Sequence, residues 1–322
     1  MHAAVRNNNV PLIRQLLAAR GDPNSFGDQG IPPIFLCESV GATDALLGAG
    51  ANIECELGDS FDYPGTALHI AVECRRAGVA ARLIQAGIDV DDINCHGRSP
   101  LHVADSVECV KLLLSYSADV NILDDESETP LFSAAAVLPE GATKALLEAG
   151  VVVDCKNTFG ATALYSACDC ARYPTAKLLL RAGADVNLAE HIDLGRTTLH
   201  AAVDPLFGEE SGYTGPNEGM HDRQGRLDLV DALLLRKAEV NHISSAGHET
   251  PIMLTKDVEL IWMLLRAGAD TTLGEDARKS DAWRVAVREA QGYGLQYVQK
   301  REMGLSQTET WKRHTRPRRA FF

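Results

Sequence analysis

A unit of about 33 residues recurs along most of this chain, and this repetition constrains its fold more than any other feature. The clearest copy runs from Thr162 to Asn187 and contains two short apolar segments joined by a turn at 172–174. The second segment stops at Gly183, which can adopt the left-handed backbone conformation that commonly ends helices. A single unit of this size cannot bury its own apolar face, so the repetition predicts a stack of two-helix layers.

The first segment of most units begins with a box of the type Thr-Pro-Leu-His, and a Gly-Ala-Asp box follows the second segment. The apolar residue of the first box recurs at Ile34, Leu68, Leu101, Leu131, Leu164, Leu199 and Ile252. The steps between these positions are 34, 33, 30, 33 and 35 residues, then 53 where a segment is inserted. Two boxes in this order and at this period resemble the ankyrin repeat. Over roughly residues 1–273, the resemblance implies an all-α ankyrin-type α-solenoid with short β-hairpin fingers between its layers.

The expected domain organisation is one long array followed by two short C-terminal segments. The array spans residues 1–273 and holds about eight repeats, the first truncated and the seventh carrying a Gly- and Pro-rich insertion at 204–225. Residues 274–304 have a helical pattern, which predicts a C-terminal helical cap. Its inward candidates include Trp283, Val287 and Ala290. Residues 305–322 are basic and turn-prone, which predicts a flexible tail.

The charge of the chain is divided unevenly between the array and its C-terminal end. The formal net charge is −13, from 31 Lys and Arg against 44 Asp and Glu. Residues 275–322 hold 11 basic and 6 acidic residues, a net +5, which leaves 20 basic and 38 acidic residues, a net −18, in residues 1–274. An acidic body argues against nucleic-acid binding. It favours a basic protein or peptide partner, or a tail that folds back onto the body.

The sequence carries no recognisable catalytic or metal-binding motif. It has no phosphate-cradling loop, nucleophile elbow, HExxH helix or CxxC pair, so we expect no cofactor and no metal. Eight scattered cysteines predict reduced thiols in a reducing compartment. No signal peptide or membrane-length apolar run is visible. We therefore expect a cytoplasmic protein without membrane association, with the nucleus as the alternative because of the short basic run at 316–319.

Three histidines stand at the fourth place of the repeat box. They are His69, His102 and His200. The resemblance implies that this histidine ties the hairpin to the start of the helix through hydrogen bonds. Phe, Tyr or Met replaces it in other repeats, which a catalytic role would not tolerate.

The candidate binding residues follow from the positions through which ankyrin-like repeats bind, namely the finger tips and the residues just after the first box. The helix positions carry acids in four of five repeats, at Glu73, Asp105, Asp169 and Asp204. The finger positions add His96, Arg98, Asp125, Glu126, Glu128, Phe159, Arg196 and Ser245. A longer finger between Asn52 and Gly65 contains Phe61 and Tyr63, which contact a partner or pack on the neighbouring finger. These residues predict an acidic groove with aromatic and Arg anchors, against the alternative of ordinary surface acidity.

Two classes of function follow from these residues. The first is a non-catalytic scaffold that binds another protein or peptide, with a Lys/Arg-rich segment as the expected partner. The second is an enzyme whose groove around the sixth to eighth repeats is roofed by the 204–225 insertion. Its candidates for proton transfer are Asp169, Asp204, Tyr165 and His221. A third hypothesis places the basic tail in the acidic groove as an autoinhibitor.

Overall fold

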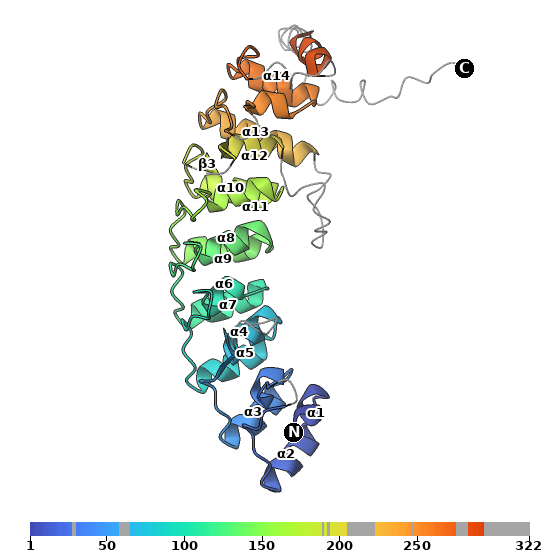
Figure 1. Ribbon diagram of the computed structural model, residues 1–322, viewed down its shortest axis with the longest axis vertical. Helices are drawn as coiled ribbons and strands as arrows, with labels where there is room; N and C mark the ends of the chain where they lie inside the picture. Colours follow the sequence, from blue (N-terminus) through green and yellow to red (C-terminus); the bar gives the residue numbers. More distant parts are fainter. Residues whose placement is uncertain are drawn as a thin grey trace, which may run out of the picture.

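The computed structural model is an elongated stack of two-helix layers that follow one another in sequence order (Figure 1). The described residues are 1–27, 30–57, 65–188, 190–191, 194–204, 223–245, 248–274 and 283–292. Phe61, Tyr63, His221 and the basic tail at 305–322 lie outside these ranges. The all-α repeat architecture expected from the sequence is confirmed.

Within the described residues, each layer pairs a first helix with a second helix that packs behind it. The first helices are α1 (His2–Arg6), η1 (Pro33–Leu36), α4 (Ala67–Glu73), α6 (Pro100–Val103), α8 (Pro130–Ala136), α10 (Ala163–Asp169), α12 (Thr198–Val203) and η2 (Pro251–Leu254). The second helices are α2 (Val10–Ala18), α3 (Val40–Gly48), α5 (Ala77–Gln85), α7 (Val107–Ser115), α9 (Glu140–Glu148), α11 (Tyr173–Arg181), α13 (Arg223–Leu235) and α14 (Val258–Arg266).

The fingers project from one side of the stack and join each layer to the next (Figure 1). Two of them contain antiparallel strand pairs, β1 (Glu56–Leu57) with β2 (Gly65–Thr66), and β3 (Glu190–His191) with β4 (Arg196–Thr197). The strands are only two residues long because each finger turns back at once into the next first helix. The described parts of the fingers therefore stand beside one another along the stack.

The core is a row of box leucines and small residues between the layers. Leu68, Leu131 and Leu199 are fully or almost fully buried, as are the alanines that flank them on the first helices. Small side chains let neighbouring helices approach closely, which is why each layer can be thin and still exclude water. Each first helix packs on the first helix of the next layer, as α8 does on α10 and α10 on α12.

In the three layers that have one, the box histidine ties the layer to the following finger. The Nδ1 atom of His69 accepts from the backbone N–H of Thr66 at 3.1 Å, and its Nε2 atom donates to the carbonyl of Arg98 at 2.9 Å. His102 and His200 repeat this arrangement toward the carbonyls of Glu128 and Glu249. The carbonyl can only accept, so Nε2 carries a proton, and Nδ1 carries none because it accepts the backbone N–H; the ring is therefore neutral. These hydrogen bonds are the structural role that the sequence analysis expects of the box histidines.

The C-terminal end of the stack is covered by a helix at residues 283–292. Its Trp283 is buried and donates from Nε1 to the carbonyl of Ile252 at 2.8 Å, which joins the helix to η2. Val287 and Ala290 are buried on the same helix, as their spacing predicts. None of the described helices is long and apolar enough to cross a membrane.

The seventh repeat corrects one expected boundary. The insertion was expected to run to residue 225, but α13 already begins at Arg223. Arg223 donates two hydrogen bonds to the carboxylate of Asp257, at 2.6 and 2.7 Å, and lies 3.2 Å from the carboxylate of Glu259. These bonds hold the first turn of α13 against α14. Because the contact joins two different repeats, the local residue pattern does not reveal where α13 begins. Residues 205–222 of the insertion lie outside the described residues.

Candidate functional site

Three successive fingers are each closed by the side chain of an Asn or Asp at their first position. The Oδ1 atom of Asp124 accepts from the backbone N–H groups of Glu126 and Glu128, at 3.0 and 2.9 Å. Asn94 and Asn157 form the same pair of bonds in their own fingers. Bonds of this kind mimic a backbone turn and fix its conformation. The tips of these fingers are therefore presented on rigid turns.

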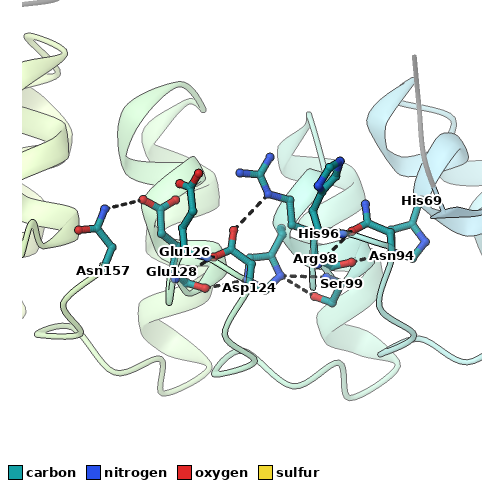
Figure 2. A network of polar contacts seen from close by, with 10 residues as sticks. His69, Asn94, His96, Arg98, Ser99, Asp124, Glu126, Glu128 and Asn157 are labelled. Atoms are coloured by element: carbon teal, nitrogen blue, oxygen red, sulfur yellow. Dashed lines mark hydrogen bonds and ion pairs between the residues drawn. The ribbon is translucent and has the colours of Figure 1, made fainter. Parts of the chain in front are cut away.

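Bonds between neighbouring fingers join them into one row, here called the finger row and made of residues 94–98, 124–128 and 157–161. The backbone N–H of Asp125 donates to the carbonyl of His96 at 3.1 Å, and that of Thr158 donates to the carbonyl of Glu126 at 2.8 Å. Side chains add a second set of links, which Figure 2 shows. Arg98 Nε donates to Asp124 Oδ2 at 3.1 Å, and Asn157 Nδ2 donates to Glu128 Oε1 at 2.8 Å.

The finger row presents several of the predicted binding residues to solvent. His96, Asp125 and Glu126 are exposed, and Phe159 is 42% exposed. Arg98 and Glu128 are half-buried. The side chains of His96, Arg98, Glu126 and Glu128 project from the same side of the fingers (Figure 2). One face of the row thus combines carboxylates with a cation and a nearby aromatic ring.

Two predicted acids, Glu73 and Asp105, lie at or just after the ends of first helices. Asp105 pairs with Arg75 at 2.6 Å, and both side chains are substantially exposed. Burial raises the pKa of the Glu73 carboxyl, and the Asp105 carboxylate raises it further, while Arg98 opposes the shift. Arg98 of the finger row is thus near enough to Glu73 on α4 to affect its carboxyl electrostatically.

Carboxylates crowd one another along this surface, which we call the acidic strip. Its members are Glu73, Arg75, Arg98, Asp105, Asp124, Asp125, Glu126 and Glu128. Six acids face two arginines, so the strip carries a net negative charge. Burial raises the pKa of Glu128, the bond from Asn157 lowers it, and the carboxylates of Asp124 and Glu126 raise it again. A partner that brings positive charge relieves this mutual repulsion.

A second polar cluster lies between the sixth and seventh layers. The Nη2 atom of Arg196 donates to the backbone carbonyls of His200 and Asp204, at 3.3 and 2.5 Å, and lies 3.4 Å from Asp204 Oδ2. Asp169 and Tyr165 belong to the facing helix α10, and both influence this cluster electrostatically. Three of the four residues proposed for catalysis, Tyr165, Asp169 and Asp204, therefore lie on α10 or at the end of α12, two helices that pack on each other.

Asp169 and Arg196 are expected to be exposed binding residues, but the structure buries both. Asp169 is 5% exposed and Arg196 is 7% exposed, so neither lies on an open surface. The reason is the packing of α10 on α12, which places both side chains between layers. Asp204 remains half-exposed, because it follows the last turn of α12.

The same cluster is poorly suited to proton transfer. Burial raises the pKa of the Tyr165 hydroxyl far above its ordinary value, the Asp169 carboxylate raises it further, and Arg196 lowers it only in part. A general acid or base works best with a pKa near the operating pH. Tyr165 is also only 3% exposed. Among the residues that the structure describes, no cluster of His, Cys, Asp and Glu is arranged to hold a metal ion.

Sequence reasoning missed the residues that organise the finger row. Asn94, Asp124 and Asn157 each stand five residues before the Ser or Thr of the following box. This regular spacing of a turn-forming residue is a signal in the sequence, and its bonds to the backbone give it a physical meaning. Arg75 was also missed, because its pairing with Asp105 joins two different repeats.

Comparison with known proteins agrees with this architecture. A family model described as ankyrin repeats (3 copies) matches residues 1–124 and 105–190, more than half of the chain. The neurogenic locus notch homolog protein 1 of Xenopus tropicalis is 30% identical over 185 residues, 52% of this chain and 7% of that protein. The human ankyrin repeat and SOCS box protein 16 is 33% identical over 172 residues, 49% of this chain and 37% of that protein.

The human neurogenic locus notch homolog protein 2 is 30% identical over 189 residues, 53% of this chain and 8% of that protein. The chain thus spans much less than two thirds of the length of these relatives. Ankyrin repeats generally serve as protein–protein interaction modules. On the family model and the repeated layers together, the chain belongs to the ankyrin repeat family.

Proposed function

We propose that this protein is a non-catalytic scaffold that binds a Lys/Arg-rich segment of a partner protein along the acidic strip. The observation that carries the proposal is the crowding of Glu128 by the carboxylates of Asp124 and Glu126 on rigid, interlinked fingers, beside the exposed Asp125. Opposite charges would steer such a segment to the strip and fix its register. The eight cysteines, taken as reduced thiols, support a cytoplasmic location for this scaffold.

The rigidity of the finger row supports a binding role. Binding costs free energy whenever loops and side chains must be ordered. The finger backbone is already held by the Asx side chains and by the bonds between fingers, as with Asp124 inside its finger and Asp125 toward His96. A partner would therefore lose little affinity to ordering of this surface.

The exposed ring of Phe159 supports a partner that contains arginine. Phe159 stands on the finger next to the one that carries Glu126, because the two fingers share the bond from Thr158 to the Glu126 carbonyl. A guanidinium can stack on an aromatic ring while it contacts a neighbouring carboxylate. A lysine ammonium can contact the carboxylate, but it cannot stack flat on the ring as a planar guanidinium does. The strip therefore favours Arg over Lys opposite Phe159.

A random peptide library displayed on phage tests this proposal without knowledge of the natural partner. Selection on the immobilised full chain should enrich peptides rich in Arg and Lys. We expect the double variant Asp125→Lys/Glu126→Lys to bind the selected peptide at least about tenfold more weakly, measured by fluorescence anisotropy. Both residues are exposed, so the change should leave the fold intact.

The matched control is Glu140→Lys/Glu148→Lys on helix α9. Glu140 and Glu148 are also exposed, and replacing them changes the net charge of the protein by the same amount. This control should retain the affinity of the unaltered chain. Equal losses in the two variants would show that only overall charge matters, and selection of acidic or neutral peptides would contradict the proposal outright.

A further inference from the structure

Exposed apolar side chains lie directly beside the acidic tips. Ile93 is 52% exposed and Leu123 is 51% exposed, and each immediately precedes the Asx residue that closes its finger. The two fingers are adjacent, because the N–H of Asp125 donates to the carbonyl of His96. Together with Phe159 on the third finger, these two side chains add apolar contacts next to the negative charge of the finger row. A fitting occupant therefore needs aromatic or aliphatic residues as well as positive charge.

The last residues of the chain carry this combination. Residues 309–322 contain five Lys or Arg and one acid, Glu309. The basic residues are Lys312, Arg313, Arg316, Arg318 and Arg319. Trp311 precedes them, and Phe321 and Phe322 end the segment. Few stretches of the chain combine basic and aromatic residues so densely, and this one complements the finger row in both respects.

The distance from the end of the cap helix permits contact within one chain. Eighteen residues, 293–310, separate the described helix 283–292 from Trp311. When extended, they could span up to about 60 Å. Packed helices lie about 8–10 Å apart, so the step from the cap helix to η2 and the three further steps back to α8 cover roughly 40 Å. The segment is therefore long enough to reach the finger at 124–128.

We propose that residues 309–322 dock on the finger row of their own chain and compete there with the partner. The inference rests on the proposed function, because it assigns the same surface to both occupants. An intramolecular ligand acts at an effective concentration in the millimolar range when its linker spans the distance. A weak contact therefore suffices to occupy the row. A tightly binding partner displaces the segment, so the segment sets a threshold for binding.

A labelled synthetic peptide with the sequence of residues 309–322 is the probe for this contact. It is titrated with the full chain and with a full-length tail variant in which Lys312, Arg313, Arg316, Arg318 and Arg319 are replaced by Gln. We expect the tail variant to bind the probe at least about tenfold more tightly than the unaltered chain, because its finger row is vacant. Adding Asp125→Lys/Glu126→Lys to the tail variant should abolish this gain.

Four results would overturn the inference. Equal affinity in the unaltered chain and the tail variant would show that the segment does not occupy the row. Affinity unchanged by Asp125→Lys/Glu126→Lys would place the probe elsewhere. Dimers of the unaltered chain in analytical ultracentrifugation, absent in the tail variant, would show that the segment binds a second copy. If the tail variant ignores the probe but binds the phage-selected peptide, the inference fails while the proposed function stands.

Discussion

At the scale of single residues, the fourth position of the repeat box determines how many hydrogen bonds join neighbouring layers. Where it holds histidine, the ring accepts from the cap and donates to the next finger, as His69 does between Thr66 and Arg98. Where Phe132 occupies it, the hydroxyl of Thr129 is buried without a hydrogen-bond partner in the structure. Repeats of the same array thus differ in how strongly hydrogen bonds connect one layer to the next.

This difference predicts unequal effects for one substitution at two equivalent threonines. Thr66→Val should lower the free energy of unfolding by about 1–2 kcal/mol, because the hydroxyl lies 2.9 Å from His69 Nδ1 and caps α4. Thr129→Val should cost almost nothing, because its hydroxyl makes no hydrogen bond. Urea denaturation followed by circular dichroism measures both. A similar loss at the two sites would mean that histidine adds nothing to the joint.

The histidines also predict how stability depends on pH. Burial lowers the pKa values of His69, His102 and His200, the last to about 4. Because the unfolded chain binds the proton more tightly, the stabilisation is complete above about pH 6.5 and is lost as pH falls toward 4. For His200 alone the loss at pH 5 is about 2 kcal/mol.

Denaturation midpoints between pH 7.5 and pH 5 measure this loss. His200→Gln removes the titrating group, so its midpoint should depend less on pH than that of the unaltered chain, although it starts lower. An identical pH dependence in the two proteins would exclude His200 as a source of the acid sensitivity.

At the scale of helices, the second helix of each layer ends in the left-handed region whether or not glycine is present. Gly183 has φ of 96°, whereas Lys237 occupies the equivalent place with φ of 62°. Only glycine adopts this conformation without a steric cost from Cβ. The glycine of the Gly-Ala-Asp box thus indicates a left-handed backbone position. The seventh repeat places Lys237 there, at a cost in conformational energy.

Exchanging the residue types should reverse the costs. Gly183→Ala should destabilise the protein by about 1 kcal/mol, since its new Cβ meets no neighbouring atom and only the backbone conformation opposes it. Lys237→Gly should stabilise it by up to about 1 kcal/mol. Thermal unfolding monitored by calorimetry gives both values. A destabilised Lys237→Gly variant would show that the lysine side chain contributes more than its backbone costs.

Helix boundaries mark the limit of what local sequence predicts. The period of the boxes was sufficient to place every box from Ile34 to Ile252 on a first helix, because burial of the box residue is a repeated local property. The start of α13 was not predictable, because Arg223 is held by Asp257 from another layer. The burial of Asp169 depends likewise on which helix covers it.

At the scale of the whole molecule, stacking converts a local repeat into one continuous surface. The exposure of the finger positions His96, Asp125 and Phe159 could be predicted, because the tip of a finger lies at the edge of the stack. The burial of Arg196, whose side chain turns under α12, could not be predicted. The organising Asx residues became visible only when their bonds within each finger were known. The acidic strip is thus a property of several layers and of no single repeat.

The most direct test of the central claim is hydrogen–deuterium exchange of the full chain with and without the phage-selected basic peptide. If the partner binds the acidic strip at the finger row, amides of residues 94–98, 124–128 and 157–161 should exchange more slowly when the peptide is bound, while those of α13 and α14 stay unchanged. Protection confined to α13 and α14, or to the second helices, would contradict the account.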